Sequence, residues 1–238
     1  SFADDFVGEV NFTTNFSGSH LDPTHALNDQ IYKFENITLK GDVDFIMIGD
    51  DNNNTIITDG GNDKLYGGKG NDTLSSGAGN DEIYGEGGND TLILNNSGTQ
   101  LYDGGEGVDT FKVHLPNWTT APDGYVGLVD LDLNIAAAVD DLDNPLKDTL
   151  VSIENVTLDT QYGFVIKGND TNNILIGGSG NDTLSSGDGD DRLFGGLGDD
   201  VLIISGTGDS ILDGGVGIDT FKIDLSNYTP PEGVTGFA

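Results

Sequence analysis

Aspartate recurs every nine residues in two long stretches of this sequence, and each aspartate stands in the same short context. Glycines precede it, usually as a pair followed by a third, and one large apolar residue comes two positions after it. The aspartates are Asp63, Asp72, Asp81, Asp90, Asp182, Asp191 and Asp200, and the apolar residues are Leu65, Leu74, Ile83, Leu92, Leu184, Leu193 and Leu202. A fixed short period indicates a repeat architecture in which each unit stacks on its neighbours.

The repeat reads glycine, glycine, x, glycine, x, aspartate, x, apolar, x. Its x–apolar–x part predicts a short strand with one inward side chain, and its glycine-rich part predicts a turn. Two repeats make one coil of eighteen residues, so turns two repeats apart stack and bring carbonyl oxygens and two carboxylates together. A site made only of oxygen atoms suits calcium, because zinc prefers histidine or cysteine and magnesium keeps its waters.

The composition also indicates a chain that needs cations. Its 238 residues carry a formal net charge of −32, from 41 acidic and 9 basic residues, and include 37 glycines and no cysteine. Disulfides therefore cannot stabilise the fold, and the basic surface of a nucleic-acid-binding protein is absent. We expect neither a membrane span nor an N-terminal signal peptide. The aromatic residues and the regularly placed leucines argue against a disordered chain.

A longer period contains the first. At an offset of 119 residues, FENITL at 34–39 matches IENVTL at 153–158. Further along, the offset becomes 110, so that Asp72 corresponds to Asp182 and Asp109 to Asp219. The two offsets differ by nine residues, which indicates that one whole repeat was gained or lost between two related units.

We therefore predict an all-β fold of two tandem right-handed parallel β-rolls, that is, β-solenoids, each with a short β-rich capping segment. Alternating apolar and polar residues predict the strands of the caps, and a short helix is expected near 135–142. The predicted first unit, 1–119, has its cap at 1–48 and its roll at 49–118; the second, 120–238, has its cap at 120–167 and its roll at 168–228. Residues 229–238 would begin a further unit, since PPEGVTG at 230–236 resembles APDGYVG at 121–127.

The nonapeptide resembles the calcium-binding repeat of RTX (repeat-in-toxin) proteins, over about residues 49–113 and 168–225. The resemblance implies one ion between turns n and n+2. One turn supplies its aspartate with the carbonyls of positions two and four, and the other supplies its aspartate with those of positions one and three. The implied pairs are Asp63 with Asp81, Asp72 with Asp90, Asp182 with Asp200, and Asp191 with Asp209, and Asp109 and Asp219 end the two runs. The implied turn residues are Asp59, Gly61, Gly68, Gly70, Ser76, Gly77, Ala78, Gly79, Gly85, Gly87, Gly178, Gly180, Ser186, Gly187, Asp188, Gly189, Gly195 and Leu197.

Some positions depart from this pattern. Asn54 and Asn173 stand at the aspartate position of the first turns, where a neutral oxygen would make weaker end sites. We expect Thr99 to replace aspartate where the second unit has Asp209, with one extra residue after Leu101 and after Ile211. Stacking of the turns predicts about four or five calcium ions per unit.

Motifs of other protein classes are incomplete. GGKGNDT at 67–73 lacks the serine or threonine that follows the lysine of a phosphate loop, and the three histidines lack the H-E-x-x-H spacing of zinc proteases. Successive repeats carry a row of asparagines, at Asn62, Asn71, Asn80 and Asn89, but not the threonines of an ice-binding face. The chain is not expected to be an enzyme.

We expect folding to be coupled to calcium binding, because stacked carboxylates repel one another and the apolar content is low. Extracellular calcium modules have dissociation constants of about 10⁻⁴–10⁻³ M, so the chain would fold outside the cell. The RTX resemblance implies bacterial type I secretion and an extracellular or cell-surface location.

Three functions remain open: a spacer in a large secreted or surface-anchored protein such as an adhesin, a folding and secretion module of an enzyme or toxin, and a glycan-binding module. The duplication favours the spacer. Expected partners are calcium ions, neighbouring tandem units of the same parent chain, the type I secretion machinery and surface glycans. Nucleic acid and a membrane span are not expected, and the fragment should be monomeric.

Overall fold

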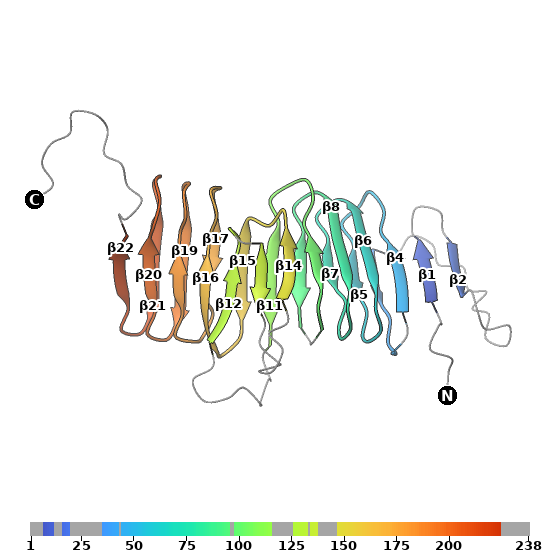
Figure 1. Ribbon diagram of the computed structural model, residues 1–238. Helices are drawn as coiled ribbons and strands as arrows, with labels where there is room; N and C mark the ends of the chain where they lie inside the picture. Colours follow the sequence, from blue (N-terminus) through green and yellow to red (C-terminus); the bar gives the residue numbers. More distant parts are fainter. Residues whose placement is uncertain are drawn as a thin grey trace, which may run out of the picture.

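The structure is a computed structural model that describes residues 7–11, 16–19, 35–42, 44–95, 98–115, 126–132, 134–137 and 147–224. These residues form strands and turns, which stack into a long body of two facing sheets (Figure 1). Within the described ranges, no helix is long and apolar enough to cross a membrane.

Over the described residues, sheet A has thirteen strands and sheet B has nine. In spatial order, sheet A contains β2 (Phe16–Ser19), β1 (Val7–Asn11), β4 (Asp44–Ile48), β6 (Lys64–Lys69), β8 (Glu82–Gly87), β10 (Leu101–Asp103), β14 (Lys147–Val151), β13 (Ile135–Ala137), β12 (Val126–Asp130), β16 (Gly163–Lys167), β18 (Thr183–Ser185), β20 (Val201–Ile204) and β22 (Thr220–Ile223). Sheet B contains β21 (Ile211–Val216), β19 (Arg192–Leu197), β17 (Ile174–Ile176), β15 (Asn155–Asp159), β11 (Thr110–His114), β9 (Thr91–Leu94), β7 (Thr73–Ser75), β5 (Thr55–Ile57) and β3 (Asn36–Thr38).

Within the repeats, consecutive strands alternate between the two sheets, and each pairs in parallel with the strand two repeats away. The chain is therefore an all-β parallel β-solenoid, and the nine strands of sheet B correspond to about nine turns. In the first run the register step is eighteen residues: Thr55 lies beside Thr73, and Thr73 beside Thr91. The predicted coil of two nonapeptides is confirmed.

The core is a narrow row of side chains between the two sheets. The apolar residue of each nonapeptide points into it, and Leu65, Leu74, Ile83 and Leu92 have no exposed surface. One inward side chain per strand is enough, because the facing sheet covers it and the strands above and below cover its sides. This geometry explains how a chain with only 35% hydrophobic residues has a continuous core.

The register differs from the predicted frame at the end of each run. Leu101 lies beside Glu82 and Ile211 beside Arg192, so the step there is nineteen residues. The extra residue therefore lies before Gln100 and before Ser210, and not after Leu101 and Ile211 as predicted. The inward side chains fix this register, since Tyr102 must stack beside Ile83 in the core. Gln100, not Thr99, consequently occupies the aspartate position.

Both sheets continue across the predicted boundary between the units. In sheet B, β11 pairs with β15, and in sheet A, β10 pairs with β14. Strands β14, β13 and β12 then form an antiparallel insert before β16 restores parallel pairing. The described strands of the second predicted cap thus lie inside the stack; we call the contact of β10 and β11 with β14 and β15 the seam. The two-unit division and the right-handed coil stay predictions.

The helix expected near 135–142 does not begin at its first residues, because 135–137 form β13 and pair with both β12 and β14. The rest of that segment, from 138 on, lies outside the described residues. Residues 1–6, 20–34 and 225–238, which include parts of the first predicted cap and the predicted start of a further unit, also lie outside them.

Candidate metal centres

The repeat aspartates form buried columns along the two edges of the solenoid. Each stands at the end of a turn, directly before a strand, so the eighteen-residue step places it over the aspartate two repeats away. Oδ1 of the later aspartate accepts the backbone N–H of the earlier one: 2.8 Å from Asp63 to Asp81, 2.7 Å from Asp72 to Asp90 and 2.8 Å from Asp182 to Asp200. The structure thus brings together three of the four predicted pairs.

The other carboxylate oxygen of these aspartates has no partner. Oδ2 is buried and accepts no hydrogen bond within the described residues in Asp63, Asp72, Asp81, Asp90, Asp109, Asp182, Asp191 and Asp200. A buried polar group without a partner costs about 1–3 kcal/mol, and more when it is charged. The eight oxygens lie in two columns, and a row of bound cations along each column would give every one of them a partner.

Backbone carbonyl oxygens of the turns lie close to these unpartnered Oδ2 atoms. A Cβ built on Gly177 would lie 2.6 Å from Oδ2 of Asp182 and 2.6 Å from the carbonyl oxygen of Gly195, which begins the next stacked turn. In the same way, a Cβ on Gly67 would meet Oδ2 of Asp72 and the Gly85 carbonyl. The aspartate of one turn and the position-one carbonyl of the turn stacked on it therefore converge, and glycine leaves the space between them free.

Other turn carbonyls already accept one backbone hydrogen bond. Asp59 O accepts from Ala78 N at 2.7 Å, and Ala78 O accepts from Gly61 N at 3.1 Å. A carbonyl oxygen has a second lone pair, so these bonds still allow metal ligation. Glycine is again required at position four: Gly70 has φ 114°, and a Cβ there would lie 2.7 Å from the Asn52 carbonyl oxygen.

The donors fit calcium, which binds six to eight oxygen ligands and accepts backbone carbonyls readily. In the described residues, no three side chains of His, Cys, Asp or Glu gather as a metal cluster. This is the expected outcome for sites that combine only two carboxylates with main-chain oxygens. The assignment of individual ligands stays a prediction.

A second ladder, on the outside of each turn, was not predicted. The residue before each of the seven nonapeptide aspartates is Asn or Asp, and the Oδ1 atoms of this row accept the backbone N–H of the matching residue one coil later. Asn71 N donates to Asn53 at 2.9 Å, and Asn89 N to Asn71 at 2.9 Å. The recurring Asn or Asp before the aspartate was the available signal, and its side chain links successive turns by hydrogen bonds.

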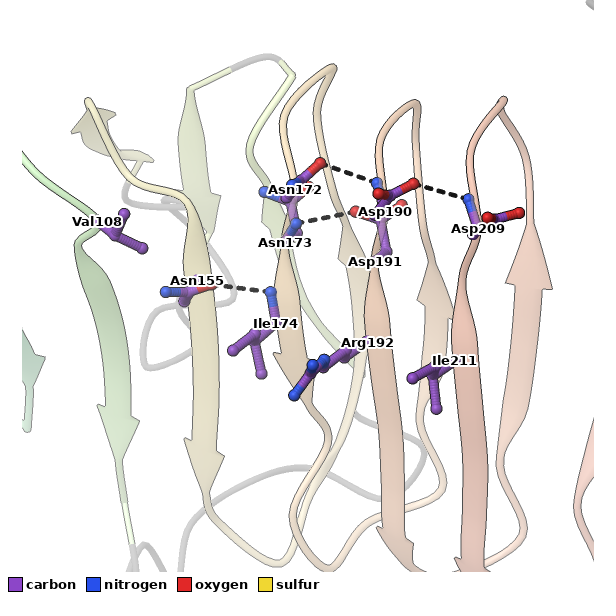
Figure 2. A pocket seen from close by; sticks show the side chains of 10 residues that line it. All are labelled: Val108, Asn155, Asn172, Asn173, Ile174, Asp190, Asp191, Arg192, Asp209 and Ile211. Carbon is purple, nitrogen blue, oxygen red and sulfur yellow. Dashed lines mark hydrogen bonds between the residues drawn. The ribbon is translucent and has the colours of Figure 1, made fainter.

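Figure 2 shows this ladder in the second run, around a surface hollow of about 410 Å³. Asp190 N donates to Asn172 at 2.9 Å, and Asp209 N donates to Asp190 at 2.8 Å. Asp209 is therefore an exposed member of the outer ladder, and the predicted pair of Asp191 with Asp209 is wrong in register. Ser210 stands over Asp191, because the extra residue shifts the frame by one.

The ends of the columns differ from their middles. Asn54 and Asn173 are buried, but their Oδ1 atoms cap their own turns by accepting from Asp50 N at 2.8 Å and Asn169 N at 2.9 Å. Gln100 is buried with an unpartnered Oε1. Asp219 is exposed, and its Oδ1 accepts from Asp200 N at 3.1 Å.

Burial raises the pKa of the column aspartates, because a carboxylate removed from water is destabilised relative to the neutral acid. Backbone hydrogen bonds to Oδ1 lower these pKa values in part. The pKa is about 6 for Asp63, Asp72, Asp90 and Asp109 and about 7 for Asp182, and it is also raised for Asp81, Asp191 and Asp200. Without metal, folding therefore favours protonated columns.

These pKa values predict opposite effects of acid with and without calcium. In chelator, the solenoid should gain stability as the pH falls from about 7 toward 4, because a carboxyl group whose folded pKa lies above its unfolded value binds more protons when folded. In calcium, the same acidification should raise the calcium midpoint, because protons compete for the ligands. Far-UV circular dichroism at several pH values tests both signs. Failure to gain any β structure on acidification in chelator would contradict the expectation.

Comparison with known families agrees with this geometry. Residues 48–83, 70–97 and 167–202 match the model of the RTX calcium-binding nonapeptide repeat, which spans four copies. The matched segments contain every buried column aspartate except Asp109, and these segments consist of RTX calcium-binding nonapeptide repeats. Such repeats are typical of extracellular proteins exported by type I secretion. No curated protein matches the chain.

Proposed function

We propose that this chain is a calcium-stiffened spacer, made of tandem units, in a large secreted or surface-anchored bacterial protein such as an adhesin. The duplication of its backbone carries the proposal. Val7 lies beside Asp44 in β1 and β4, and 119 residues later Val126 lies beside Gly163 in β12 and β16. The hairpins repeat as well: Glu9 pairs with Gly18, and Leu128 with Ala137.

The apolar end of the stack supports the same proposal. Phe111 and Val113 of β11 are buried beside β15. Their equivalents 110 residues later, Phe221 and Ile223 of β22, are each 57% exposed. The end at β22, in sheet A, thus exposes the same kinds of apolar residue that β11 buries beside β15 in sheet B. A further unit of the same kind would cover them.

The chain's own residues explain how such a unit could be stiff. The aspartate columns run along the stack, and each aspartate is joined to the next by one backbone hydrogen bond. Calcium, when bound, would supply the positive charge that allows the paired carboxylates to remain ionised and close together. Because each ion would link two successive turns, the columns would resist both bending and separation of turns. In a medium poor in calcium the same columns would repel one another, which suits export of an unfolded chain.

A spacer must bear load from end to end, and this can be measured on the chain as it is. We expect the chain, pulled by its two ends in an optical trap, to stay folded in millimolar calcium at forces that fully extend it in chelator. Small-angle X-ray scattering should show a rod in calcium and an expanded coil in chelator. Equal, low unfolding forces in both conditions would contradict the spacer function, even if calcium were bound.

A further inference from the structure

The column of carboxylates in front of sheet B continues past the last nonapeptide of the first run. Strand β11 pairs with β15 in the register that sets Thr110 beside Asn155. The residues just before these two, Asp109 and Glu154, therefore occupy equivalent places on successive turns. Glu154 belongs to no nonapeptide and lies 45 residues from Asp109 in the sequence.

The contacts of Glu154 reproduce those of a column aspartate. Asp109 N donates to Oε2 of Glu154 at 2.8 Å, as Asp90 N donates to Oδ1 of Asp109 at 2.7 Å. The backbone ladder is also continuous: Asn155 N donates to Asp109 O at 2.9 Å, as Thr110 N donates to Asp90 O at 2.8 Å. In its backbone and side-chain hydrogen bonds, Glu154 thus occupies the next position of the column.

The carbonyl oxygen of Ser152 also lies where a repeat turn places its first carbonyl oxygen. A Cβ on Gly85 would lie 2.5 Å from the Gly104 carbonyl and would also meet Oδ2 of Asp90. A Cβ on Gly104 would lie 2.5 Å from Oδ2 of Asp109 and would also meet the carbonyl of Ser152. Ser152 therefore takes the role of the first residue of a repeat.

The turn at the seam is shorter than a nonapeptide turn, and two features compensate for this. It runs only from Ser152 to Glu154, and the glutamate side chain is one methylene longer than aspartate. Ser152 also has φ 50°, a left-handed conformation that the second residue of a repeat normally reaches with glycine, as in Gly105 at φ 95°. A non-glycine residue there is costly, which is consistent with a requirement on where its carbonyl points.

The two carboxylates at the seam would be stabilised by a bound cation. Asp109 has no exposed surface, and its Oδ2 has no hydrogen-bond partner in the described residues. Glu154 is half-buried, and the Oε2 atom of its carboxylate accepts the backbone N–H of Asp109. Oδ2 of Asp109 and the Ser152 carbonyl oxygen converge beside Gly104, and the Glu154 carboxylate lies next to Asp109. Carboxylate and carbonyl oxygens are the donors that a hard divalent ion takes.

We propose that Asp109, Glu154 and the Ser152 carbonyl form a calcium site at the seam, outside the nonapeptide pattern. It rests on the proposed calcium-dependent function and adds a regulatory role: it joins the first run of repeats to β15 and hence to the second run. With the seam site filled, the stack melts as one cooperative unit. Without it, the first and second runs melt separately.

Counting bound calcium by native mass spectrometry tests the site. We expect Glu154→Gln, which keeps the hydrogen bond from Asp109 N, to bind one ion fewer than the wild type. Thermal melting in calcium should change from one transition to two. The matched control is Glu35→Gln, at the position 119 residues earlier: Glu35 is exposed and precedes β3, which ends sheet B. This control should keep the full count and the single transition.

Glu154→Lys provides a second variant in case Glu154→Gln fails to fold. Its ammonium group can take the place of the ion, so this variant should fold in calcium with one ion fewer and melt in one transition. A full ion count in Glu154→Gln, or in Glu154→Lys, would overturn the seam site. If the wild type itself bound no calcium, the proposed function would fail instead, so the two failures are distinguishable.

Discussion

Removal of calcium is expected to convert the chain from a β-solenoid to a largely disordered polypeptide. In the part of the chain that the structure describes, eight buried carboxylates have one oxygen without a hydrogen-bond partner, and the whole chain carries a net charge of −32. At neutral pH these carboxylates must either ionise without a counterion or keep a proton at a free-energy cost. The single-file core offsets little of the backbone entropy, which costs about 1–2 kcal/mol per ordered residue.

The measurement is a far-UV circular dichroism titration that starts in chelator, with magnesium as the control ion. We expect a cooperative coil-to-β transition at millimolar calcium and none with magnesium, since magnesium releases its waters reluctantly. Asp72→Ala and Asp182→Ala, one from each run, should each shift the midpoint to higher calcium. A chain already folded in chelator would show that the core and seam suffice alone, and the calcium-driven mechanism would have to be abandoned.

The repeats made much of the fold predictable. A coil of eighteen residues places the apolar residue of every nonapeptide between the two sheets. Leu65, Leu74 and Ile83 are indeed buried there. The stacked pairs, such as Asp72 with Asp90, follow from the same count. Local periodicity was sufficient here because every contact of the run is made at one fixed sequence separation.

The misplaced residues show where periodicity ends. An extra residue between Leu94 and Asp109 can be placed before or after Leu101 without breaking the pattern. Only the pairing of Tyr102 with Ile83 decides the matter, because the ring must enter the core. The same ambiguity misassigned Asp209.

The seam was beyond sequence analysis for a different reason. Glu154 meets Asp109 across 45 residues, and Asp148, whose Oδ1 accepts from Gln100 N at 2.9 Å, does so across 48. Neither separation is a multiple of the eighteen-residue coil. The antiparallel insert of β12, β13 and β14 sets both separations, and no periodic signal reports it.

Replacement of Phe111 by alanine should destabilise the calcium-bound chain severely, whereas the same change at Phe221 should not. Phe111 has no exposed surface, packs edge-on against Tyr102 with ring centroids 5.0 Å apart, and lies between Leu92 and Val156 on the neighbouring strands. Truncation of a buried phenylalanine costs about 3–5 kcal/mol. Phe221 occupies the equivalent position 110 residues later but is 57% exposed, so its loss should cost less than about 1.5 kcal/mol.

The two variants form a matched pair, since both change TFK to TAK within a strand that follows a repeat aspartate. Urea unfolding in saturating calcium measures the difference, provided that the transition is two-state. Equal losses would mean that Phe221 is covered in solution, and the apolar end could not be the surface that receives a further unit. A large loss at Phe111 alone would show that the phenylalanine after a repeat aspartate stabilises the fold at the seam. The equivalent phenylalanine in β22 would then remain free to pack against another unit. Tandem growth of the stack requires this difference, because each new unit must bury an edge that the previous unit leaves exposed.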